Sequence, residues 1–123
     1  MIRRFAAVYA ARAINSIHLG QYDAALADSN RAIELDPAFG LAYVARVIVY
    51  MNSGGHDEQA LADCNTAITL DPGITSAYMY RGLLLAKAGQ RDQAIADLKH
   101  VMELEPNNTF VRTFLRQMGV PGY

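Results

Sequence analysis

The sequence predicts an all-α fold, an α-solenoid of three helix-turn-helix repeats followed by a seventh, capping helix. The first observation is a sequence motif at residues 25–37 that is repeated at 60–72 and, with lower similarity, at 94–106. The second is its period, because the prolines that close the copies are 35 and then 34 residues apart. The third is the placement of glycine in the middle of each period and proline at its end.

Each period is expected to contain two helices separated by a turn. The first helices are predicted at residues 4–18, 40–52 and 75–88, and the second helices at 22–35, 57–70 and 91–104. Gly20, Gly54 and Gly89 lie in the turns within the pairs. A left-handed conformation is common there, and glycine adopts it without strain. A proline follows each second helix and ends it, because proline cannot continue the helical hydrogen-bond ladder.

A seventh helix is predicted at about 108–118, after the last proline. Its apolar face would cover the flank of the third repeat and consists of Phe110, Val111, Phe114, Leu115 and Met118. The first helix has no comparable cap in the sequence. Either its outer flank is exposed, or the chain is part of a longer protein.

Length, charge and cysteine content narrow the class of protein. The 123 residues match one domain with a modest core. With 11 basic and 12 acidic residues the net charge is −1, so the chain lacks the net positive charge that attracts nucleic acid or an anionic membrane. The single cysteine excludes an internal disulfide framework and favours a reducing compartment, by default the cytoplasm.

Neither the start of the chain nor its most apolar segment predicts a membrane role. The basic and apolar start is interpreted as the first helix and not as a signal peptide, because helical patterning continues through it. The longest apolar stretch, at 41–51, is about half the length that a bilayer requires. No membrane insertion is expected.

The repeat unit resembles the tetratricopeptide repeat. The shared features are an early tyrosine and arginine, a glycine in the turn, two alanines in the second helix and a closing proline. In the three repeats they are Tyr9, Arg12, Gly20, Ala25, Ala32 and Pro37, then Tyr43, Arg46, Gly54, Ala60, Ala67 and Pro72, then Tyr78, Arg81, Gly89, Ala94 and Pro106. The third repeat departs once, with Val101 in place of the second alanine.

The resemblance covers residues 6–106 and divides a single domain, 1–123, into repeats at about 6–39, 40–74 and 75–108. It implies a right-handed superhelix whose first helices line a concave groove. Three repeats with a capping helix form a common binding module in this family. The resemblance therefore implies a non-catalytic protein-interaction module, such as an adaptor, a scaffold or a chaperone-like protein.

Arginine and aspartate recur in step with the repeat. The pairs are Arg12 with Asp28, Arg46 with Asp63, and Arg81 with Asp97. Three copies on three repeats do not converge on one site, so they do not suit acid–base catalysis. We expect three structural ion pairs, each joining the first helix of a repeat to the second.

The first helices carry a further stripe, on the side that the resemblance assigns to the groove. Between residues 41 and 51 only Arg46 is polar, and a helix that is apolar all round needs cover on every side. The candidate groove residues are Ala10, Ile14, Ile17, Leu41, Val44, Ile48, Met51, Asn52, Met79, Leu83 and Lys87. Either the superhelix buries this stripe, or the stripe forms a groove for an apolar peptide or amphipathic helix.

An acidic ligand and a catalytic site are both disfavoured. Some members of the family bind the acidic C-terminal tails of heat-shock chaperones through a clamp of Lys, Asn and Arg. The matching positions here hold Ala10, Ile14, Ala45 and Tyr80, so the groove is expected to be apolar. The three histidines lie in three different repeats, and no nucleophile motif or phosphate-binding loop is present. We expect no enzyme, no metal and no cofactor.

Two hypotheses of function follow. The first is a module that binds an apolar segment of another protein in its groove. The alternative is a structural module that associates with itself, through the groove or through the first helix, or a fragment of a larger repeat protein. Neither hypothesis involves nucleic acid.

Overall fold

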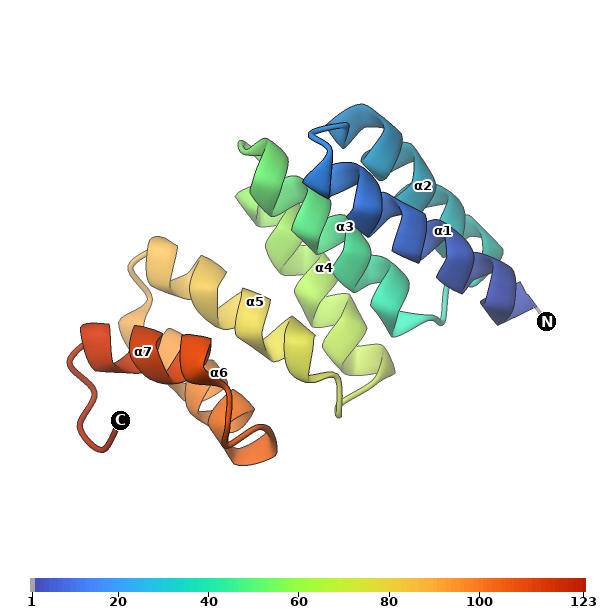
Figure 1. Cartoon of the computed structure of the whole chain (residues 1–123). Coiled ribbons are helices and arrows are strands. Elements are labelled where there is room, and N and C mark those ends of the chain that lie inside the picture. The colour runs from blue at the N-terminus through green and yellow to red at the C-terminus, as the bar shows by residue number, and fades with distance from the viewer. Residues whose placement is uncertain (1) are drawn as a thin grey trace. The chain divides into compact units, whose positions relative to one another are not determined.

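The computed structural model describes residues 2–123, which fold into seven α-helices without a strand (Figure 1). The helices are α1 (Ile2–His18), α2 (Tyr22–Leu35), α3 (Gly40–Ser53), α4 (Asp57–Leu70), α5 (Thr75–Lys87), α6 (Arg91–Leu104) and α7 (Thr109–Gln117). The all-α helical repeat fold is therefore confirmed. The second helices have the predicted bounds, and the other helices differ from prediction by one or two residues at their ends.

The chain packs into two units, one up to Ile74 and one at Thr75–Tyr123. In the first unit α1 packs on α2 and α3 packs on α4, while α3 also contacts both helices of the first repeat. In the second unit α5 packs on α6, and α7 contacts α6 (Figure 1). The first pair, α1 with α2, is therefore covered on one flank by α3, and α6 of the third pair is covered by α7.

The turns within the pairs depend on glycine. Gly20 and Gly89 have φ angles of 73° and 81°, in the left-handed region that other residues rarely adopt. Their amides donate hydrogen bonds back to the ends of α1 and α5, which satisfies carbonyl groups that the helix leaves unpaired. The local sequence thus fixes where the first helices stop.

The core of the first unit is built mainly from small side chains. One buried cluster joins α1, α2 and α3 and consists of Ala6, Ala10, Ala32, Ala42 and Ala45. A second cluster, nearer the other end of the same helices, consists of Ala13, Ile17, Ala25 and Val49. Alanine at these crossings lets the helix backbones approach closely, and a larger residue there would overpack the contact at a cost of about 1–3 kcal/mol.

The core of the second unit forms under α7. Val111 and Leu115 are fully buried and pack against buried residues of α6, with Val120 closing the cluster from beyond the helix. Phe110 was expected on the same packed face, and this expectation is wrong: its side chain is 57% exposed and stacks on Phe114 at 6.4 Å. Residues 110 and 111 are neighbours in sequence, so they project about 100° apart around a helix.

One close helix crossing in the second unit depends on a glycine. A Cβ added at Gly82 would lie 2.8 Å from both Cγ and Cδ2 of Leu98, which is fully buried. The equivalent positions of the second repeat hold Val47 and Cys64, so that repeat has the larger residue on the first helix. At this helix crossing the third repeat has its larger side chain on the second helix, whereas the second repeat has its larger side chain on the first helix.

Candidate functional site

Each arginine of the repeating pairs bonds to the aspartate of its own repeat. Arg46 donates from Nε and Nη2 to the two carboxylate oxygens of Asp63, both at 2.7 Å. Arg12 binds Asp28, and Arg81 binds Asp97, in the same two-bond arrangement. Planar pairs of this kind are the stronger ion pairs in proteins.

Burial differs between the arginines but not between the aspartates. All three aspartates are buried, yet the Arg12 side chain is 63% exposed whereas that of Arg46 is 24% exposed. The hydrogen bonds that Arg46 donates to Asp63 raise the pKa of Arg46, and those that Arg12 donates to Asp28 raise the pKa of Arg12. Both guanidinium groups are therefore held in the charged form that arginine already prefers.

A tyrosine lies under each of these arginines. The guanidinium carbon of Arg12 is 5.3 Å from the ring centre of Tyr9, and Arg46 is 5.9 Å from that of Tyr43. Arg81 repeats the arrangement over Tyr78 at 5.4 Å. Sequence reasoning used these tyrosines only as features of the repeat and missed the cation–π contact. The available signal was the constant three-residue spacing within a helix, which puts both side chains on one face.

Through these contacts the paired arginines of the first helices bind carboxylates of the second helices. None of α1, α3 and α5 contains an acidic residue, and their paired arginines reach across to the second helices. The guanidinium groups of the three pairs are therefore committed to the hairpins, each with its Nε and one Nη bound to a carboxylate.

In the first unit the candidate groove residues differ widely in exposure. Ala10, Ile17 and Val44 are buried and present little surface to a ligand. The half-buried residues are Ile14, Ile48 and Met51. At the start of α3, Leu41 is 51% exposed, and Asn52 is exposed near the end, where its amide nitrogen donates to the Ile48 carbonyl.

In the second unit the candidate groove residues of α5 also differ in exposure. Met79 and Leu83 are half-buried, and Lys87 is exposed. Met79 packs against the cluster that α6 and α7 bury, as do Phe114 and Met118 of α7. Sequence reasoning gave these two α7 residues only a capping role. In the structure both remain partly exposed.

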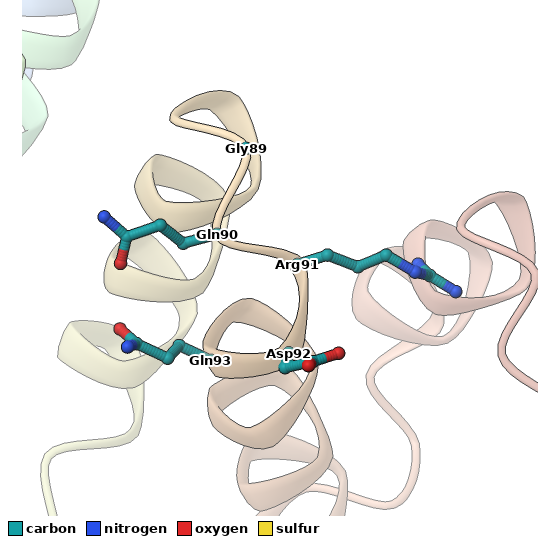
Figure 2. Close-up of a pocket in the computed structure, with 5 residues that line it drawn as sticks. All are labelled: Gly89, Gln90, Arg91, Asp92 and Gln93. Atoms are coloured by element: carbon teal, nitrogen blue, oxygen red, sulfur yellow. The ribbon is translucent and has the colours of Figure 1, made fainter.

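Two of the surface hollows lie at turns and are not built sites. One hollow of about 380 Å³ follows α5 and is lined by Gly89, Gln90, Arg91, Asp92 and Gln93. Figure 2 shows the Gln90 and Gln93 side chains on one side of this turn and Arg91 on the other, so they do not converge. A similar hollow lies at the turn before α4. Such scattered polar groups cannot hold a reacting group in one place.

Two further features, a cluster of metal-ligating side chains and a membrane-spanning helix, are absent from residues 2–123. Within this range no three His, Cys, Asp or Glu side chains are grouped as a metal ion would need. No helix in the same range has the length and apolar character needed to cross a membrane.

Comparison with solved structures finds close relatives of this fold. The first tetratricopeptide repeat (TPR) domain of human RPAP3 is 27% identical with a TM-score of 0.88, covering 95% of this chain and 91% of that one. The first TPR of Spaghetti (RPAP3), bound to the HSP90 peptide SRMEEVD, is 28% identical with a TM-score of 0.88 and 94% coverage of both chains. The second TPR domain of human RPAP3, in complex with the HSP70 peptide SGPTIEEVD, is 28% identical with a TM-score of 0.83, covering 97% and 98%.

Sequence comparison gives the family directly. No protein with a curated description matches the chain. Models of the tetratricopeptide repeat match residues 6–39 and 75–108, which are the predicted first and third repeats and together make up more than half of the sequence. The chain belongs to the tetratricopeptide repeat family.

Proposed function

We propose that this chain is a non-catalytic protein-interaction module whose first helices bind an apolar peptide or amphipathic helix of another protein. The observation that carries the proposal is that each unit presents exposed or half-buried apolar side chains on a first helix, Leu41 and Ile48 on α3 and Met79 on α5. Apolar side chains at helical spacing fit the apolar face of a bound helix. Methionine adds an adaptable surface, because its side chain repacks easily.

The structural relatives support a peptide as the ligand but not the same peptide. The RPAP3 domains are bound to peptides that end in the acidic sequence EEVD. Recognition of such a terminus needs cationic or amide donors in the groove. Here the arginines of the first-helix pairs bind the second helices instead, and Ile14 stands at one of the matching positions. We therefore propose that this chain selects apolar peptides, in contrast to the acidic peptides bound by the RPAP3 domains.

A binding experiment separates the two ligand classes. The full chain is titrated with SRMEEVD, with SGPTIEEVD and with peptides selected on it from a random display library. We expect the two acidic peptides to show no saturation up to about 1 mM, which corresponds to about −4 kcal/mol of binding free energy. The selected peptides should be rich in Leu, Ile, Phe and Met. Tight binding of the acidic peptides that weakens with added salt would overturn the proposal.

A matched pair of variants then tests the place of binding. Leu41→Asp puts a charge on the stripe, and Leu104→Asp puts the same charge at the end of α6, on a second helix. The two leucines are 51% and 46% exposed, so neither change should unfold the chain. We expect Leu41→Asp to weaken the selected peptides at least tenfold and Leu104→Asp to leave them unchanged. Equal effects would place the ligand elsewhere.

A further inference from the structure

The outer flank of α1 is an exposed surface that the proposed function does not use. It carries Phe5 and Val8, which are 55% and 59% exposed, together with the exposed Ala11. These residues are spaced three apart, so they form one stripe along the helix. The stripe is distinct from the Ala10, Ile14 and Ile17 side of α1.

The next repeat contains the same stripe in covered form. One period later in the sequence stand Phe39, Ala42 and Ala45, at the start of α3 and on it. Ala42 and Ala45 are fully buried, and Phe39 packs against their cluster. Their cover consists of Ala6, Ala10, Tyr9, Ile14, Ala32, Ile33 and Leu35. A helical pair, α1 with α2, is therefore what covers this stripe within the same molecule.

The same flank carries Arg12, whose Nη1 is a hydrogen-bond donor that the hairpin does not use. Arg46 binds Asp63 through Nε and Nη2, and its remaining Nη1 donates to Oδ1 of Asn30 on α2, at 3.0 Å. Arg12 stands one period earlier and binds Asp28 through the same two atoms. Within residues 2–123 its Nη1 donates no hydrogen bond. The position that Asn30 fills for Arg46 is thus open for Arg12.

Charge indicates which occupant the flank prefers. Arg4 and Arg12 lie four residues before and after Val8 on α1, which has no acidic residue, and Arg12 is already bound by Asp28. Two copies of α1 placed face to face would bring like charges together, which is unfavourable. The helix that covers α3 has the opposite character, because α2 carries three acidic residues and one arginine. The flank therefore favours an acidic helix over a second copy of itself.

We propose that the outer flank of α1 docks a helix of a partner protein. The contact stripe of that helix is small and apolar, as in α2, and it offers an Asn, Asp or Glu oxygen to Nη1 of Arg12. Docking would cover Phe5 and Val8 as the first unit partly covers Phe39 and buries Ala42. The surface lies on another side of α1 from the proposed peptide stripe, so one chain could hold two partners at once.

The probe is a synthetic peptide of residues 22–36, the segment that covers α3. A hydrocarbon staple between positions 27 and 31 keeps it helical, because Ala27 and Arg31 are both exposed on α2. The peptide is titrated into isotopically labelled full chain, and backbone amide signals are followed by NMR. We expect saturable shifts centred on Val8 and Arg12, with saturation below about 1 mM.

Variants on both sides of the contact make the result specific. Val8→Asp should weaken the probe at least tenfold, and Phe110→Asp on α7, at an equally exposed phenylalanine, should not change it. A probe with Asn30→Ala should bind about tenfold more weakly, because it lacks the acceptor for a charged donor. Circular dichroism of each variant checks that the fold is kept.

Three results would overturn the proposal. One is the absence of saturable shifts on α1 up to about 1 mM probe. The second is shifts confined to α3, which would mean that the probe has replaced the chain's own α2. The third is a dimer that forms without probe on concentration and is lost in Val8→Asp, which would assign the flank to a second copy of this chain.

Discussion

The Arg46–Asp63 pair gives the most informative test of what holds the helical hairpins together. The proposed change is Asp63→Asn, which keeps the size of the side chain and removes its charge. Asp63 is buried and accepts two bonds from Arg46, at 2.7 Å each. The variant leaves the guanidinium charge in place, with Asn30 and the rings of Tyr43 and Tyr50 as its other contacts.

The magnitude follows from the burial of the two partners. Removing one member of a fully buried pair costs about 3–5 kcal/mol, and one hydrogen bond to a charged group contributes about 1.5–3 kcal/mol. Arg46 keeps 24% of its side chain in water and retains Asn30, so the loss should fall near 3 kcal/mol. For a chain of this length that corresponds to a decrease in Tm of about 10 °C.

Thermal and urea unfolding, followed by circular dichroism at pH 7, measure the effect. The control is Glu34→Gln in the Arg31–Glu34 pair, whose side chains are 52% and 68% exposed. An exposed pair contributes little, so this control should change stability by less than about 0.5 kcal/mol. A double-mutant cycle with Arg46→Met isolates the coupling between the two partners. If Asp63→Asn costs no more than Glu34→Gln, the pair does not stabilise the hairpin and the reasoning fails.

Three further predictions rest on single contacts. Gly82→Ala should lower the free energy of unfolding by about 1–3 kcal/mol, because the added methyl group would clash with Leu98. The double variant Gly82→Ala with Leu98→Cys should lose less stability than the two single variants lose together. Urea unfolding of all three variants measures this difference. Because the hydrogen bond from Arg3 lowers the pKa of Asp36, its stabilising effect is present above about pH 4 and is lost as pH falls through the lowered pKa; Asp36→Asn should remove that part of the Tm–pH curve. Asn108 caps α7 through a bond from a backbone amide in its first turn, so Asn108→Ala should cost about 1 kcal/mol in urea unfolding, and an unchanged midpoint would contradict the cap.

Most of the secondary structure could be predicted because its signals are local. Glycine in a turn and proline after a helix act through the conformation of one residue, so the bounds of the second helices follow from the sequence. The pairing of Arg12 with Asp28 was also predictable, because a repeated charge pattern on two neighbouring helices leaves few other partners. The close approach of Gly82 to Leu98 was not, since it depends on the distance between two helix axes.

The candidate site was less predictable for the same reason. Val44 and Leu41 are both apolar and lie on one predicted stripe, yet Val44 is buried and Leu41 is half exposed. Periodicity says which residues share a face, but the neighbouring helix decides how far its cover extends along that face. Phe110 illustrates the same limit on α7, where the sequence pattern cannot tell the edge of the packed face from its centre.

The Arg–Asp pairs that recur in the three repeats explain why this chain is poorly suited to a cationic clamp for an acidic peptide. The positive charges that recur on the first helices are each bound by a buried carboxylate of the second helix. Turning one of them to a ligand would leave that carboxylate buried without its partner, which costs several kcal/mol. A cationic groove would therefore need additional basic residues at positions such as Ala10, which is packed against its neighbours. Apolar recognition requires no such change, because the residues that stabilise each hairpin and those offered to a ligand stay separate.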